Sequence, residues 1–173
     1  MTQVLLLGDS LVASHNWQSR LGSYRVANLA MPGVMTSDLF SSLDETKAEQ
    51  PYADIIMLMV GTNDILTGNF EFIHTLRKIC VWLCKNYPSA EILITSIFPM
   101  VLSHLPYNTI SSLNCHIEAL TMQTGCCYLD IHSRLQDSSL PIFQEDGVHV
   151  TAETYEIWCR SLLEHIAFLI EDD

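Results

Sequence analysis

The stretch "VLLLGDSLVAS", residues 4–14, carries the pattern that decides the fold. Its four leading apolar residues stop at Gly8 and are followed by Asp9 and Ser10. A short apolar run that ends at a glycine is typical of a strand covered on both faces, as in a parallel sheet. This strand would place the Ser10 hydroxyl at its carboxyl end. That hydroxyl is either part of a helix cap or a nucleophile.

Further strand candidates follow at regular intervals, with helical patterns between them. Strands are expected over 3–7, 24–30, 53–61, 90–98 and 125–131. Apolar spacing predicts helices over 69–86, 108–123 and 151–170, the last with Thr151 as its N-cap. This alternation predicts an α/β fold, a doubly wound five-stranded parallel sheet with right-handed crossovers. We expect the 173 residues to form a single domain, 1–173.

The composition argues against several classes of protein. Hydrophobic residues make up 49% of the chain and charged residues 16%, as in a globular protein. The net charge of −12 argues against nucleic acid as a partner, because phosphates need lysine and arginine to neutralise them. No apolar stretch is long enough to span a bilayer, and no basic segment precedes the first apolar run. We therefore expect a cytoplasmic protein without stable membrane insertion.

The six cysteines show no spacing typical of a metal site or a redox motif, because no C-x-x-C pair occurs. They stand at positions 80, 84, 115, 126, 127 and 159. We interpret them as free thiols, mostly small buried hydrophobes, rather than as disulfides or as metal ligands.

Polar residues gather where the predicted strands end. Ser10 follows the first strand and Asn63 the third, while Asp146 and His149 precede the last helix. Because function in parallel sheets sits at the carboxyl edge, these residues are expected to share one site. A serine needs a base such as His149 to take its proton, and Asp146 can fix the tautomer of that imidazole. The triad is therefore predicted to be Ser10, Asp146 and His149.

An acyl-transfer site also needs donors for the oxyanion. The backbone N–H groups of Ser10 and Gly33 and the side-chain amide of Asn63 are the predicted donors. Pro32 before Gly33 also fits a type II turn, which is compatible with this role. Asp9 and Asp64 are expected to be structural residues that order their own turns.

Four blocks of the chain resemble the SGNH hydrolase superfamily, also called the GDSL esterase/lipase family. They are "GDSL" (8–11), "NLAMPGVMTSD" (28–38), "GTND" (61–64) and "DGVH" (146–149), in the family's order. The segment "AEILITSIFP" (90–99) is similar to the family's fourth strand. One departure is Ala30, where many members carry a glycine.

The resemblance implies a flavodoxin-like three-layer α/β/α sandwich. It also implies a serine hydrolase of small-molecule esters or thioesters, of the esterase, lipase or lysophospholipase kind. Such an enzyme works through an acyl-enzyme with no metal or other cofactor. A carbohydrate O-acetylesterase would use the same residues, and a non-catalytic binding relative is the alternative of another class. No G-x-S-x-G elbow is present, which disfavours the ordinary α/β-hydrolase fold.

The loop "IFPMVLSHLPYN", residues 97–108, is long and apolar for a connection at this edge of the sheet. Long loops of this kind are often functional. The residues expected to form part of an acyl-binding wall are Phe98, Met100, Val101, Leu102 and Leu105. The alternative is that they only pack on the neighbouring helix.

Overall fold

The computed structural model describes residues 1–171 and contains one five-stranded parallel sheet in the order β2-β1-β3-β4-β5. The strands are β1 (Gln3–Gly8), β2 (Arg25–Asn28), β3 (Ile55–Met59), β4 (Glu91–Thr95) and β5 (Cys127–Leu129). The chain runs outward from β1 to β2 and then crosses back to β3. The strand order therefore reverses beside β1, and such reversals open a ligand crevice at the carboxyl edge of the sheet.

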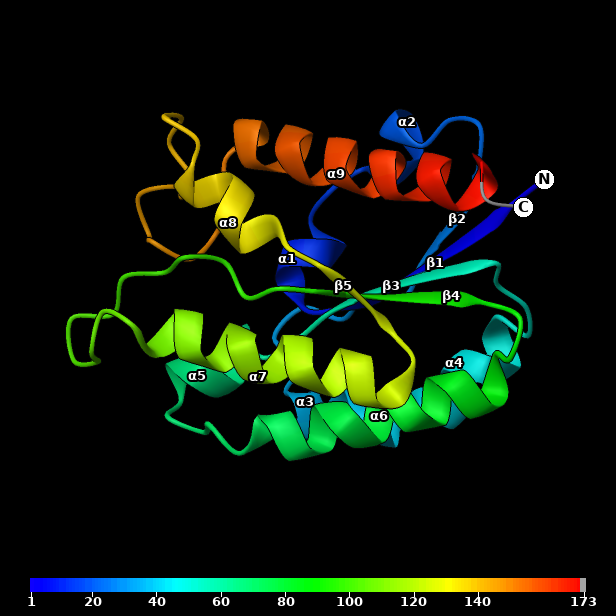
Figure 1. Ribbon diagram of the computed structural model, residues 1–173, viewed down its shortest axis with the longest axis horizontal. Coiled ribbons are helices and arrows are strands. Elements are labelled where there is room, and N and C mark those ends of the chain that lie inside the picture. The colour runs from blue at the N-terminus through cyan, green and yellow to red at the C-terminus, as the bar shows by residue number, and fades with distance from the viewer. Residues whose placement is uncertain (172–173) are drawn as a thin grey trace.

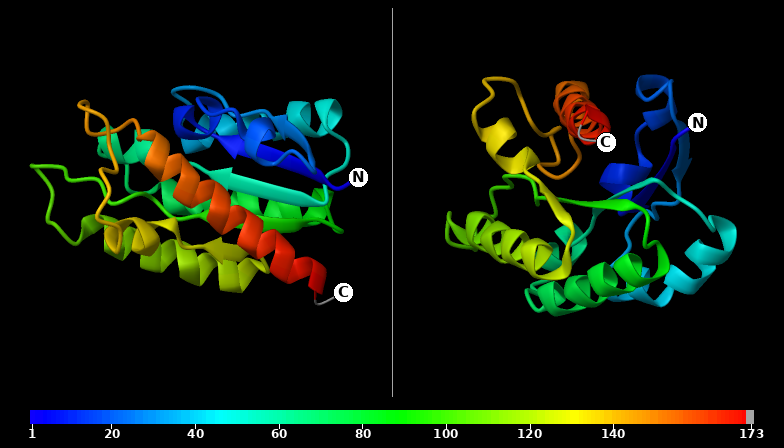
Figure 2. Two further views of the ribbon diagram at one scale, coloured as in Figure 1. Left: turned by 90° about the horizontal axis from the view of Figure 1, so that it is seen from above. Right: turned by 45° about the vertical axis from the view of Figure 1, so that its right-hand side comes forward.

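Helices cover both faces of this sheet, so the protein is a three-layer α/β/α sandwich (Figures 1 and 2). Nine helices lie within the described residues. They are α1 (Ser10–Ala13), α2 (Trp17–Arg20), α3 (Thr36–Ser41), α4 (Leu43–Glu49), α5 (Thr62–Leu66), α6 (Phe72–Asn86), α7 (Thr109–Thr124), α8 (Ile131–Gln136) and α9 (Ala152–Glu171). The helices α3, α4, α6 and α7 lie on one face of the sheet, and α8 and α9 lie on the other (Figure 1).

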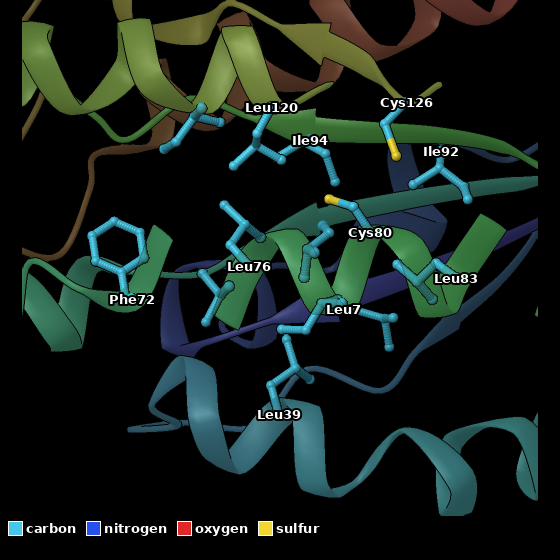
Figure 3. Packing of buried hydrophobic residues seen from close by; sticks show 14 of the residues in the cluster. Leu7, Leu39, Phe72, Leu76, Cys80, Leu83, Ile92, Ile94, Leu120 and Cys126 are labelled. Atoms are coloured by element: carbon cyan, nitrogen blue, oxygen red, sulfur yellow. The ribbon is translucent and has the colours of Figure 1, made fainter. Parts of the chain in front are cut away.

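Two hydrophobic cores follow from the alternation of side chains along each strand. Leu5 and Leu7 point to the face covered by α6 and α7, whereas Val4 and Leu6 point to the face covered by α9. Figure 3 shows the first core, in which Leu76 and Leu83 of α6 pack beneath the strands. Fully burying one such side chain contributes about 1.5–3 kcal/mol.

The prediction of an α/β fold with five parallel strands and three long helices is confirmed. β1 extends one residue beyond the prediction, to Gly8, whereas the other four strands are shorter than expected because their ends belong to turns and caps. Gly125, for example, ends α7 with a φ of +82°, so β5 begins only at Cys127. Thr151 caps α9, since its hydroxyl oxygen accepts the N–H of Thr154 at 3.3 Å. The six helices of four to seven residues were not predicted, because elements this short show no apolar period. Within residues 1–171, no helix has both the length and the apolar character needed to cross a membrane.

Candidate active site

Ser10 is the first residue of α1 and lies directly beyond the end of β1. Gly8 makes this junction possible, because a Cβ there would lie 2.2 Å from the carbonyl oxygen of Met59 on β3. Its φ of +151° is also unfavourable for other residues. Asp9 caps the helix, and its Oδ1 accepts the N–H of Leu11 at 2.9 Å. The capping role therefore belongs to Asp9, and the half-buried Ser10 is left available for chemistry.

Asp9 is a buried carboxyl beside the serine, with 1% of its surface exposed. Its Oδ2 is buried and has no hydrogen-bond partner among the described residues. Desolvation raises the pKa of Asp9 to about 6. The negative charge of Asp64 adds to this effect, while the Leu11 N–H and the charge of His149 oppose it. His149 therefore lies within electrostatic range of the residue that precedes Ser10.

The other predicted oxyanion donors, Gly33 and Asn63, lie in the 28–38 block and in the 61–64 block. Gly33 stands in a turn that the N–H of Val34 closes on the carbonyl of Met31 at 3.2 Å, and its φ is +74°. This geometry, with Pro32 before the glycine, fits the expected type II turn. No atom lies within 4 Å of a Cβ built at Gly33, so a substrate can approach this backbone closely.

Asn63 lies in the first turn of α5, and its side chain is half-buried. Its Nδ2 donates to the carbonyl of Val34 at 3.1 Å, which holds the amide beside the Gly33 turn. Only one of the two amide hydrogens is needed for that bond. The other can serve an oxyanion.

Asp64 connects the 61–64 block to the 28–38 block through hydrogen bonds of its buried side chain. Its Oδ2 accepts from the backbone N–H of Thr36 at 3.0 Å and from the Thr36 hydroxyl at 2.7 Å. Its Oδ1 accepts from the side-chain amide of Asn69 at 3.1 Å. The expected ordering role of Asp64 is confirmed, but its link to Thr36 was not predicted. No local spacing in the sequence connects two residues 28 positions apart.

Asp146 and His149 form the opposite side of the site. The Nδ1 of His149 lies 2.5 Å from Oδ2 of Asp146, and Oδ1 of Asp146 accepts the N–H groups of Val148 and His149. The hydrogen bond to the His149 ring is the main cause that lowers the pKa of Asp146 to about 2, and the two backbone N–H groups add to it. Gly147 completes the turn with a φ of +71°. The pair therefore fixes Nδ1 toward the carboxylate and leaves Nε2 for another partner.

A local bridge supports this turn, and a long-range hydrogen bond connects the helix that follows it to α1. Phe143 and Val150 form an isolated antiparallel bridge around the turn. The hydroxyl of Tyr155, one turn into α9, donates to the carbonyl of Leu11 in α1 at 2.6 Å. Within residues 1–171, no hydrogen bond joins His149 to the Ser10 hydroxyl. Catalytic hydrogen bonds often tighten only when substrate is bound.

The loop between β4 and α7 projects beyond the sheet (Figure 1). It carries a cavity of about 200 Å³. Met100, Val101, Leu102 and Leu105 line this cavity together with Tyr107 and Ile110. Phe98 does not belong to the wall, which corrects the expectation for that residue. It is 1% exposed and packs edge-on against Trp158 in the core on the α9 face. Phe98 and Met100 are buried and Val101 is exposed, so only the part of the loop from Val101 onward faces solvent.

Among residues 1–171, no cluster of three histidine, cysteine or acidic side chains could hold a metal ion. The groups that the site offers for chemistry are a hydroxyl, an imidazole, a carboxylate and amide donors. A comparison with protein families decides the assignment. The model of the GDSL-like lipase/acylhydrolase family matches residues 6–157. The chain belongs to this family.

As a GDSL-like acylhydrolase, the protein is an ester hydrolase by class. A search of curated proteins gives no match. Among solved structures, a Streptococcus pneumonia protein named for platelet activating factor is 25% identical, with a TM-score of 0.82. The match covers 95% of this chain and 83% of that one.

Two further structures share the fold of this acylhydrolase. A lipase/acylhydrolase from Enterococcus faecalis is 17% identical with a TM-score of 0.79, and the match covers 96% of this chain and 95% of that one. An acetylxylan esterase from Geobacillus stearothermophilus is 16% identical with a TM-score of 0.77, with 94% and 93% covered. At these identities the likeness concerns the fold.

Proposed function

We propose that this acylhydrolase cleaves carboxylic esters or thioesters through an acyl-enzyme formed on Ser10. One observation carries the proposal. The His149–Asp146 pair, joined at 2.5 Å, is tied through α9 to the helix that begins with Ser10. A serine next to an oriented imidazole is the arrangement that nucleophilic acyl transfer requires.

In the proposed reaction, Nε2 of His149 takes the proton of the Ser10 hydroxyl while Oγ attacks the ester carbonyl. Asp146 holds the imidazole in the needed tautomer and stabilises its charged form. The N–H groups of Ser10 and Gly33 and the second amide hydrogen of Asn63 bind the oxyanion. His149 then returns the proton to the leaving alcohol or thiol, and water repeats the sequence on the acyl-enzyme. Removing one oxyanion donor typically lowers the rate about 10²–10³-fold.

The acyl group of the substrate is proposed to lie along the loop that follows β4. The support is the apolar lining of its 200 Å³ cavity by Met100, Val101, Leu102 and Leu105. Val101 is 92% exposed, which no packing requirement explains. We propose a small-molecule ester or thioester as the partner. The net charge of −12 argues against nucleic acid, and the free cysteines favour the cytoplasm.

The decisive experiment is the intact mass of the protein after treatment with a fluorophosphonate. Wild type should gain one phosphonyl group, whereas Ser10→Ala should gain none and keep its fold by circular dichroism. His149→Ala should react far more slowly, because the serine then lacks its base. A folded wild type that gains no adduct would favour the non-catalytic binding relative. An adduct that persists in Ser10→Ala would contradict the assignment of the nucleophile.

A series of p-nitrophenyl esters from acetate to laurate tests the acyl site. We expect kcat/KM to rise beyond acetate, and Val101→Asp to lower it for the longer esters only. Val81→Asp is the matched control, because Val81 is an exposed valine on α6 away from the loop. Strict preference for acetate, with no effect of Val101→Asp, would favour the carbohydrate O-acetylesterase.

A further inference from the structure

Three cysteines that stand apart in the sequence meet at the amino end of the sheet. Cys80 and Cys84 lie one turn apart on α6, and Cys126 lies between α7 and β5. The Sγ atoms of Cys84 and Cys126 are 3.7 Å apart. Figure 3 shows the Cys80 and Cys126 side chains pointing toward one another from α6 and from the strand side. We call these three residues the thiol cluster.

The members of the thiol cluster differ in exposure and in acidity. Hydrogen bonds from the neighbouring thiols, chiefly that of Cys80, lower the pKa of Cys126 to about 6 against the opposing effect of burial. Burial raises the pKa of Cys84 to about 11. Cys84 is half-exposed, whereas Cys126 is 8% exposed and Cys80 is fully buried. The Cys84 and Cys126 sulfurs therefore lie beside one another, and Cys84 is the member of the pair that is more accessible to solvent.

The thiol cluster does not form a metal site, since among residues 1–171 no three histidine, cysteine or acidic side chains are placed so that they could hold a metal ion. Two sulfurs 3.7 Å apart can instead form a disulfide after small side-chain rotations, because a disulfide needs about 2.05 Å. The oxidant must be small to reach Cys126. A peroxide meets this requirement.

We propose that Cys84 and Cys126 form an intramolecular disulfide when the protein meets a peroxide. The Cys126 thiolate attacks one peroxide oxygen, the O–O bond breaks, and the released hydroxide takes up a proton to become water. Cys126 is thereby oxidised to a sulfenic acid. The Cys84 sulfur then attacks the Cys126 sulfur, the S–O bond breaks, and a second water leaves with the Cys84 proton. Two thiols and one peroxide thus give one disulfide and two waters.

This modification site is independent of the proposed esterase site. The thiol cluster lies before the amino end of β5, whereas Ser10 and Asn63 follow the carboxyl ends of β1 and β3. The new bond would join α6 to the chain entering β5 and would constrain the unfolded chain between residues 84 and 126. Such a constraint stabilises the folded state. Oxidation should therefore raise resistance to urea and leave ester turnover unchanged.

The test is treatment of the folded full chain with hydrogen peroxide, followed by intact mass and peptide mapping. Wild type should lose the mass of two hydrogen atoms, show a linked pair of peptides containing Cys84 and Cys126, and unfold at a higher urea concentration. Dithiothreitol should reverse all three changes. Cys115→Ser is the matched control and should behave as wild type, because Cys115 is an exposed, isolated thiol.

Cys84→Ser and Cys126→Ser should each lose the cross-link. Added oxygen without a cross-link, or a cross-link between other cysteines, would overturn the proposal. The peptide map of wild type decides the matter even if one variant fails to fold. If the protein showed no ester turnover, the proposed function would fail, but the outcome of this oxidation test would not be affected.

Discussion

The two halves of the candidate active site are built in different ways. The nucleophile half comprises residues 8–10 and 61–64, which leave the buried strands β1 and β3 directly, and its carboxyls Asp9 and Asp64 are each 1% exposed. The base half comprises residues 146–149, and the side chains of His149 and Asp146 are 46% and 48% exposed. Packing of the sheet therefore holds the first half, while local hydrogen bonds hold the second. Substitutions at the buried positions of the first half should change stability, and those in the second half should change turnover alone.

Gly8→Ala should have the largest effect on the free energy of unfolding. The new Cβ would lie 2.2 Å from the Met59 carbonyl oxygen and 2.7 Å from Cγ2 of Val12, and neither neighbour can move freely in the core. Overpacking together with an unfavourable φ should cost at least about 3 kcal/mol, which is a large part of a typical domain's stability. Urea unfolding followed by circular dichroism measures this loss.

Gly22→Ala is the control for Gly8→Ala, because no atom lies within 4 Å of a Cβ at Gly22. It should change the free energy of unfolding by no more than about 0.5 kcal/mol. Equal urea midpoints for the two variants would show that the packing of β1 on β3 does not determine the stability of the nucleophile half.

Asp9→Asn should have an intermediate effect that depends on pH. Burial raises the pKa of Asp9 from 3.8 to about 6, so between these values the folded state keeps a proton that the unfolded state releases. Stability contributed by this group therefore falls as pH rises through that window, by about 1.4 kcal/mol per pH unit and about 3 kcal/mol in total. Asparagine cannot ionise, so the variant should gain stability relative to wild type as pH rises from 4 to 7.

Urea unfolding of both proteins across this pH range gives the difference directly. Asp64 and His149 are the charged groups that act on Asp9, and they are unchanged in the variant. Asp44→Asn, at an exposed position on α4, is the control for the removal of a carboxylate. A difference for Asp9→Asn that is flat with pH would contradict the burial of a neutral carboxyl beside Ser10.

The contrast between the halves also explains how much the sequence could predict. The buried strands leave continuous apolar runs, and the polar residues that end them stand in short local blocks. The sequence alone therefore predicts Ser10, Asn63, Asp146 and His149 as one candidate set. Contacts between distant residues leave no such pattern, and the Asp64–Thr36 and Tyr155–Leu11 hydrogen bonds were not predicted.

Two other expectations were wrong or incomplete because they depend on contacts between residues that are distant in the sequence. The apolar loop predicts a place for Phe98 in the acyl wall, but its contact with Trp158 depends on where α9 packs. The cysteines have no motif in sequence, yet Cys84 and Cys126, 42 positions apart, come within 3.7 Å because α6 packs against α7, and Cys126 follows α7. Periodicity predicts which face of an element is buried. It does not predict which distant residue lies opposite.

Asp146→Asn should have the smallest effect on stability and a large effect on turnover. The oxygen of the introduced amide could still accept the backbone N–H groups that Asp146 accepts, so the turn should persist. The nitrogen of that amide, however, would donate to Nδ1 of His149, which forces the ring proton onto Nε2. His149 then cannot take a proton from Ser10, and kcat should fall on the order of 10³–10⁴-fold. The free energy of unfolding should stay close to that of wild type, as for most exposed positions.

Steady-state turnover of a p-nitrophenyl ester and urea unfolding of the same preparation test both parts of this prediction. Asp137→Asn is the matched control, because Asp137 is another exposed aspartate that precedes α9, and it should leave both quantities unchanged. A fall in turnover with an unchanged midpoint would mean that the base half contributes tautomer control and nothing to the fold. If the midpoint fell as far as in Gly8→Ala, the 146–149 turn would be part of the folding core, and the two halves would not differ in the way their burial indicates.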